Sequence, residues 1–109
     1  MTEDEAATRA ALRRYQEHGS DLTRPMAMDF FVAVPDRKAG EKVAAEAERL
    51  GFDTSVEMDD ESQEWTCYCS KTIVPALATV LAIEKQLDEI GQRHGGHADG
   101  FGSFGNAVN

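Results

Sequence analysis

The sequence predicts an α+β fold in which two helices cover one face of a four-stranded antiparallel sheet, with an extra helix ahead of the sheet. Three observations lead to this prediction. First, the spacing of apolar residues alternates along the chain between two residues, typical of strands, and three to four residues, typical of helices. Second, Gly, Pro or Asp stands at most of the boundaries between these segments. Third, the segments follow in the order βαββαβ. A chain of 109 residues, 41% hydrophobic and 28% charged, suits a single hydrophobic core. We therefore expect one domain over residues 1–109, with an N-terminal helix within 1–19 and a core over 26–105.

The first helix is expected over about residues 4–18. The stretch EAATRAALRRYQEH is rich in strong helix formers, and Gly19 follows it as a typical C-terminal stop. A helix with a narrow apolar stripe buries little surface, so we expect it to lie against the body as a peripheral element. That stripe consists of Ala7, Ala11, Leu12 and Tyr15.

The first strand is expected at MAMDFFVAV, residues 26–34. Apolar residues occupy nearly all positions on both of its faces, which indicates a central place in the sheet. Pro35 and Asp36 end the strand and open a helix, because an acid there suits the positive end of the helix dipole. Gly51 ends this helix. Its buried stripe is expected to comprise Ala39, Val43, Ala47 and Leu50.

The next two strands form a predicted hairpin. The first strand of the hairpin runs from Phe52 to Met58, and its alternate residues face the same way. These residues are Phe52, Thr54, Val56 and Met58. Residues 59–64, DDESQE, are polar and acidic and read as the turn. The strand WTCYCSK follows, with one face formed by Trp65, Cys67 and Cys69 and the other by Thr66, Tyr68 and Ser70.

A second long helix is expected over about residues 75–94, entered through Thr72 and Pro75, and a last strand over 98–104. Gly95 is the expected left-handed cap of the helix, and His94 in the last turn suits the negative end of its dipole. The resulting order of elements is that of the ferredoxin-like split βαβ unit. The helix stripe near one face comprises Leu77, Val80, Leu81, Glu84, Leu87, Ile90 and Gly91.

Charge and composition exclude several classes of function. The chain has 11 Lys and Arg against 20 Asp and Glu, a formal net charge of -9, which argues against direct nucleic-acid binding and favours a basic partner. No basic segment leads into an apolar one at the N-terminus, and no apolar run is long enough to span a membrane, so a cytoplasmic protein is expected. Two cysteines provide no disulfide framework and suit a reducing compartment.

The segment HGGHADGFGSFG, residues 94–105, raises the question of a ligand site. A phosphate loop needs its glycines ahead of a helix, whereas these follow one, so we expect no nucleotide cofactor. We interpret Gly96 to Asp99 as a turn, in which the Asp99 side chain hydrogen-bonds to the turn backbone. We interpret GFGSF as a strand, in which Phe101 is a packing anchor. His97 is expected to be either an exposed turn residue or part of a contact surface.

The histidines and cysteines suit simple structural roles better than metal binding or catalysis. His94, His97 and Asp99 together with Cys67 and Cys69 could form a zinc site, but Cys-x-Cys on a strand lacks the geometry of a zinc knuckle. The two thiols read better as small buried residues beside Trp65. A nucleophilic cysteine needs an electropositive setting, and acids surround these two. We expect no catalytic residue, no metal and no cofactor.

Several segments together resemble the regulator of ribonuclease E activity B family over about residues 19–105. They are GSDLTRPMAMDFF before the first strand, RLGFDTSVE, EWTCYCSKTIVP and above all HGGHADGFG. Phe101 stands where this family usually has tryptophan, and Ala98 replaces an aromatic residue. The residues that match the family pattern are Gly19, Asp21, Arg24, Trp65, Gly95, Gly96, Asp99, Gly100 and Gly102.

The resemblance implies a ferredoxin-like, non-enzymatic bacterial protein that binds ribonuclease E and restrains RNA decay. We expect these matching residues other than Gly19, together with Phe101, to mark its interaction region. An acidic domain could occupy a basic surface of the enzyme by charge complementarity, without touching nucleic acid itself. The alternative is a homodimeric scaffold or small-ligand module that uses the open sheet face, where Asp29 and Tyr68 are expected. The predicted acidic contact surface is Glu57, Asp59, Asp60, Glu61 and Glu64.

Overall fold

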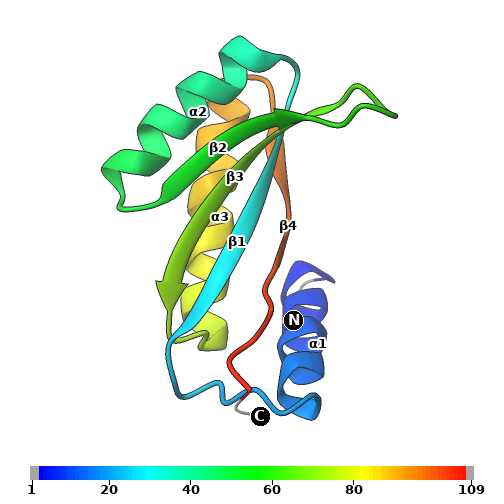
Figure 1. The fold of residues 1–109 in the computed structure, drawn as a ribbon. Coiled ribbons are helices and arrows are strands. Elements are labelled where there is room, and N and C mark those ends of the chain that lie inside the picture. Colours follow the sequence, from blue (N-terminus) through cyan, green and yellow to red (C-terminus); the bar gives the residue numbers. More distant parts are fainter. Residues whose placement is uncertain (1–2, 108–109) are drawn as a thin grey trace.

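A computed structural model describes residues 3–107 of the chain (Figure 1). Over this range it forms three helices and four strands, in the predicted order. None of the described helices is long and apolar enough to cross a membrane. The elements are α1 (Glu3–Glu17), β1 (Met26–Val34), α2 (Arg37–Arg49), β2 (Asp53–Met58), β3 (Trp65–Ile73), α3 (Leu77–Arg93) and β4 (His97–Gly102).

The four strands form one antiparallel sheet in the order β2-β3-β1-β4. β1 lies in the middle as predicted, paired with β3 from Met26↔Ile73 to Val34↔Trp65. Helix α2 connects the parallel strands β1 and β2, between which β3 is inserted, and α3 connects the parallel strands β3 and β4, between which β1 is inserted. This is the ferredoxin-like arrangement. The predicted fold class, including the extra N-terminal helix, is confirmed.

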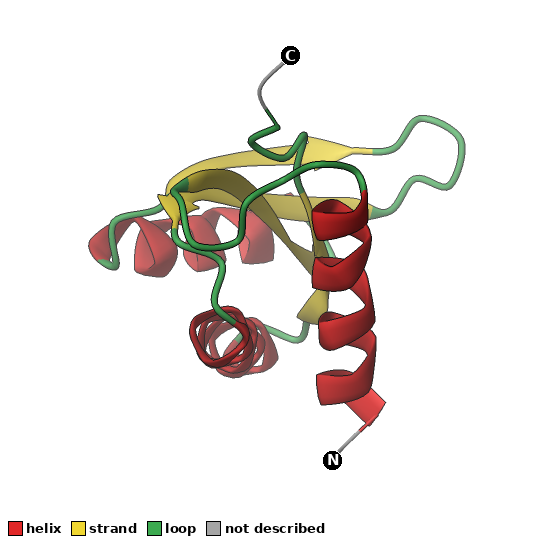
Figure 2. Cartoon of the chain, turned by 90° about the horizontal axis from the view of Figure 1, so that it is seen from below, coloured by secondary structure: helices red, strands yellow, loops and turns green. Residues whose placement is uncertain are grey.

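Helices α2 and α3 cover one face of the sheet, and none of the described helices covers the other (Figure 2). Asp36 begins α2 as its N-cap, because its side chain accepts a hydrogen bond from the Ala39 backbone N–H at 2.8 Å. Helix α1 packs against α3 and lies beside the segment that follows β4 (Figure 1). The buried Thr8 hydroxyl donates to the Glu84 carboxylate at 2.7 Å, which explains an acid within the otherwise apolar stripe of α3.

The hydrophobic core lies between the sheet and α2 and α3. Phe30 of β1 is its centre and contacts two further rings, Phe52 at 6.2 Å and Phe101 at 5.9 Å between centroids. Phe101 therefore is the packing anchor that the sequence predicted. Burying such apolar side chains supplies most of the favourable free energy of folding. The fully buried residues from the strands include Met26, Met28, Phe30, Val32, Cys67 and Cys69.

Three predictions of the fold are wrong in detail. Leu50 is 37% exposed and outside the buried stripe, because α2 ends at Arg49 and Leu50 is already the C-cap of the turn into β2. Helix α3 begins at Leu77 and not at Pro75, because pairing with β1 extends β3 to Ile73. The last strand ends at Gly102, which leaves Phe104 beyond it and fully exposed.

Candidate functional site

The face of the sheet opposite α2 and α3, here called the open face, has none of the described helices over it (Figure 2). Residues directly opposite each other on paired strands project to the same side, so the register defines the members of this face. They are Ala27, Asp29, Phe31 and Ala33 of β1, Asp53, Ser55 and Glu57 of β2, Thr66, Tyr68, Ser70 and Thr72 of β3, and His97 and Gly102 of β4.

An aromatic pair occupies the middle of the open face. Phe31 and Tyr68 lie opposite each other on β1 and β3, with ring centroids 5.5 Å apart and planes at 80°. The tip of the Phe31 ring reaches over β4, where a Cβ on Gly102 would come within 3.3 Å of it. Gly102, a residue of the family pattern, thus leaves room for the ring. The pair is half-buried, so it presents apolar surface to solvent.

β4 contains a bulge beside this pair, and it corrects the predicted role of Asp99. Phe30 pairs with Phe101 and Val32 with Ala98, so Asp99 and Gly100 together stand opposite the single residue Phe31. Gly100 adopts φ +97°, a left-handed conformation that favours glycine. Asp99 is an exposed bulge residue within the strand, and the turn between α3 and β4 ends at Gly96 instead.

The polar side chains of the open face are acidic or neutral. Asp29 accepts a hydrogen bond from the Ser70 hydroxyl at 2.5 Å, and Glu57 accepts one from Ser55 at 3.0 Å. Of the 11 Lys and Arg residues, all but Arg24 and Lys71 lie on the three described helices. Lys71 turns to the helix side, where its ammonium donates to the Leu50 carbonyl oxygen at 3.0 Å and lies 5.0 Å from the Phe52 ring centroid. The open face therefore carries carboxylates but no Lys or Arg, whereas the helices carry acids and bases together.

The hairpin between β2 and β3 carries the predicted acidic contact surface and extends beyond the helices (Figure 1). Asp59 is committed to the turn itself, because its carboxylate accepts from the backbone N–H groups of Glu61 at 2.8 Å and Ser62 at 3.3 Å. Asp60, Glu61 and Glu64 are exposed. The structure therefore gathers the five predicted acids in one hairpin, but it divides them between turn formation, the open face and the exposed tip.

A hollow of about 570 Å³ lies where the base of this hairpin meets the start of β4. It unites Glu64 and Trp65 with Gly95, Gly96 and the exposed residues His97 and Asp99, which are distant in sequence. Gly96 has a structural reason to be glycine, since a Cβ there would collide with the carbonyl oxygen of Ala33. Several residues of the family pattern therefore meet at one end of the sheet. His97 belongs to the start of β4, opposite Ala33.

The three remaining pattern residues, Gly19, Asp21 and Arg24, lie at the other end of the sheet, in the connector before β1. Asp21 forms a turn by accepting from the backbone N–H and the hydroxyl of Thr23 at 2.9 and 2.6 Å, and these bonds lower the pKa of its carboxyl. The Asn106 side chain ties the C-terminal segment to this connector through bonds to Asp21, Arg24 and Pro25. Asp21 thus has a structural role, and the predicted interaction residues do not form one cluster.

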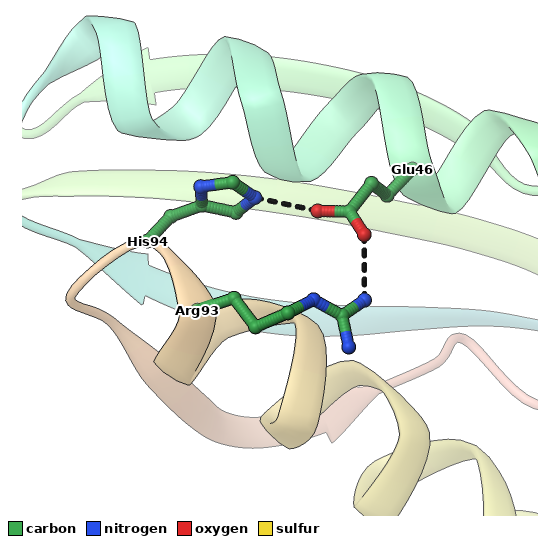
Figure 3. A network of polar contacts seen from close by, with 3 residues as sticks. All are labelled: Glu46, Arg93 and His94. Atoms are coloured by element: carbon green, nitrogen blue, oxygen red, sulfur yellow. Dashed lines mark hydrogen bonds and ion pairs between the residues drawn. The ribbon is translucent and has the colours of Figure 1, made fainter.

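His94 takes part in a contact that the sequence did not reveal (Figure 3). Its Nε2 and the Arg93 guanidinium each lie 2.5 Å from a different oxygen of the Glu46 carboxylate, which joins the end of α3 to α2. The hydrogen bonds from His94 and Arg93 hold the pKa of Glu46 below its usual range. Glu46 and His94 are 48 residues apart, and an acid on the flank of an amphipathic helix was the sole local signal.

The two cysteines are fully buried on the core side of β3, with their sulfur atoms 3.9 Å apart. The contact with Cys67 and the burial both raise the pKa of the Cys69 thiol, which opposes formation of a nucleophilic thiolate. The structure does not bring the candidate zinc ligands together, since His94 contacts Glu46 while His97 and Asp99 lie on β4. Among residues 3–107 no group of three or more His, Cys, Asp or Glu could hold a metal ion.

Comparison with protein families gives a match that covers most of the chain. The family model described as regulator of ribonuclease activity B matches residues 5–103, which is nearly the whole chain and runs from the first turn of α1 past the end of β4. The search of curated proteins found no match to this chain.

Proposed function

The chain belongs to the regulator of ribonuclease activity B family, and on this premise we propose that it restrains RNA decay by binding ribonuclease E or a similar enzyme. The family match over residues 5–103 carries this proposal. The protein acts as a binding partner and not as an enzyme. The raised pKa of the Cys69 thiol and the contact of His94 with Glu46 support this, because both residues lack the setting of a nucleophile or a base.

Charge complementarity supplies the mechanism. A ribonuclease must attract a polyanionic substrate through basic surfaces, and this chain has a formal net charge of -9. Its acids on β2 belong to the open face of the sheet, which none of the described helices covers (Figure 2), and the following hairpin extends beyond the helices (Figure 1). When such a surface docks on the basic surface of the enzyme, it competes with RNA for the same cations and lowers the rate of cleavage.

Reconstitution tests the proposed function. The purified chain is added to ribonuclease E from the same organism together with a labelled RNA, and cleavage and co-elution are measured. We expect slower cleavage and a complex on size exclusion. Absence of both would refute the proposal.

A salt titration of the same complex tests the mechanism separately. Exposed charges are screened over about 10 Å at 0.1 M salt and over about 3 Å at 1 M. We therefore expect the affinity to fall as salt rises. Affinity that stays constant from low to high salt would leave the regulator role intact but contradict the electrostatic mechanism.

A homodimeric scaffold or small-ligand module is the second candidate function. The half-buried pair of Phe31 and Tyr68 on the open face favours it, because exposed aromatic surface is often covered by a partner. Light scattering distinguishes the two candidates. A stable dimer whose formation requires Phe31 would favour the scaffold, and a monomer would favour the regulator.

A further inference from the structure

The open face combines an apolar centre with an acidic border. Phe31 and Tyr68 form the centre, at 5.5 Å between ring centroids. On one side of them β2 presents Asp53 and Glu57, each two residues away from Ser55, which lies opposite Tyr68. Asp29 adds a third carboxylate, next to Ser70. Among the described residues none of these three carboxylates is in an ion pair.

The positive side chains of the molecule are directed elsewhere. α1, α2 and α3 carry all Lys and Arg except Arg24 and Lys71, and Lys71 is held on the helix side by the Leu50 carbonyl. No Lys or Arg stands at any strand position of the open face within the described sheet. The half-buried aromatic pair is thus bordered by three carboxylates with no Lys or Arg beside them on the open face.

We propose that the open face is the docking surface for the regulated enzyme and that it takes a basic, arginine- or lysine-bearing segment of that partner. This inference rests on the proposed function and specifies its contact surface. The cationic heads of the segment meet Asp53 and Glu57, while the aliphatic stems or apolar side chains beside them pack on Phe31 and Tyr68. Guanidinium groups also gain from lying over the faces of these rings.

Charge favours a basic partner over a second copy of this chain. Two open faces brought together would oppose Asp29, Asp53 and Glu57 of one copy to the same acids of the other. Like charges placed opposite each other across an interface oppose association, whereas cations of a different partner remove the repulsion.

The open face is also better equipped for binding than the tip of the hairpin. Binding energy at protein interfaces is concentrated in aromatic and arginine contacts at the centre, and isolated exposed ion pairs contribute little. The tip carries Asp60 and Glu61, both exposed, whereas the Asp59 carboxylate is already engaged by the turn. None of the aromatic residues of the described chain lies in the turn between Met58 and Trp65.

The test compares variants of matched charge in the full chain. Asp53→Asn with Glu57→Gln removes two charges from the open face, and Asp60→Asn with Glu61→Gln removes two from the tip. Phe31→Ala removes the aromatic centre. Affinity for ribonuclease E is measured for all three variants and the original chain, after circular dichroism has verified the fold of each. We expect Phe31→Ala and the open-face pair each to weaken binding about tenfold, and the tip pair to weaken it less than about twofold.

The outcomes separate this inference from the proposed function. If the complex forms but the tip pair weakens it most while Phe31→Ala changes nothing, the inference is wrong and the regulator role stands. If ribonuclease E does not bind at all, the proposed function fails, and a hexa-arginine peptide then probes the open face by NMR. Shifts centred on Phe31, Tyr68 and Ser55 would support the docking surface, and shifts confined to the hairpin tip, or none, would overturn it.

Discussion

Two neighbouring residues of β1, Phe30 and Phe31, have the same side chain and opposite surroundings. Phe30 faces α2 and α3, is 1% exposed and contacts two further rings. Phe31 faces away from the helices and shares a half-buried contact with Tyr68 alone among the described aromatic residues. The difference teaches that one strand serves two purposes, since its core side stabilises the fold while its open side retains apolar surface for a partner.

Among these substitutions, Phe30→Ala should produce the largest effect, and this effect should be a loss of folding stability. Removing a fully buried ring leaves a cavity beside Phe52 and Phe101, and such truncations cost about 3–5 kcal/mol. The free energy of unfolding is measured by urea denaturation. A loss below about 1 kcal/mol would mean that the core does not centre on this residue.

Phe31→Ala should cost much less stability, about 1 kcal/mol, because the ring is only partly buried and loses mainly its contact with Tyr68. The same denaturation experiment provides the measurement, with Phe30→Ala as the matched comparison. Equal losses for the two variants would erase the distinction between the two faces.

Glu46 lies on the helix side, so its substitution should change stability without changing binding. Hydrogen bonds from His94 and Arg93 lower its pKa in the folded chain from the usual 4.5. Its stabilising contribution is therefore complete above pH 4.5 and is lost as the pH falls through the lower folded pKa. Glu46→Gln should cost about 0.5–1 kcal/mol at pH 7 and reduce the loss of stability between pH 4.5 and the acid limit.

Denaturation midpoints across this pH range check the prediction for Glu46. Glu48→Gln, an exposed neighbour on α2, is the control and should leave the acid profile almost unchanged. Identical acid profiles for Glu46→Gln and the original chain would show that the link between α2 and α3 contributes nothing. If Glu46→Gln weakened the complex with the ribonuclease, the binding surface would lie on the helix side of the sheet and not on the open face.

The fold was predictable because its signals are local. The alternation of MAMDFFVAV located β1 with the observed bounds, and the left-handed Gly51 and Gly95 stand directly beyond the C-caps of α2 and α3 as expected. The prediction errors arise where contacts between residues distant in sequence determine the end of an element or the burial of a side chain. β3 continues to Ile73 because Met26 pairs with it, and Leu50 is exposed because the chain turns away from the core there.

The candidate site was predictable only in part. The acidic hairpin could be read as a charged run between two strands, and the open face followed from the order of elements. The contact between Phe31 and Tyr68 needed the register of β1 and β3, and the bulge at Asp99 and Gly100 needed the pairing of β4 with β1. No spacing within the sequence encodes either feature, because both depend on which residues of different strands stand opposite each other.

Cross-saturation NMR on the complex of the labelled chain with ribonuclease E tests the central claim most directly. Saturation passes only between protons in close contact across the interface, so it maps the bound surface without any substitution. We predict that the strongest transfer will reach Phe31, Tyr68, Ser55 and Thr66, with little transfer to the outer sides of α2 and α3. Transfer concentrated on those helices, or on Asp60 and Glu61 alone, would contradict the account.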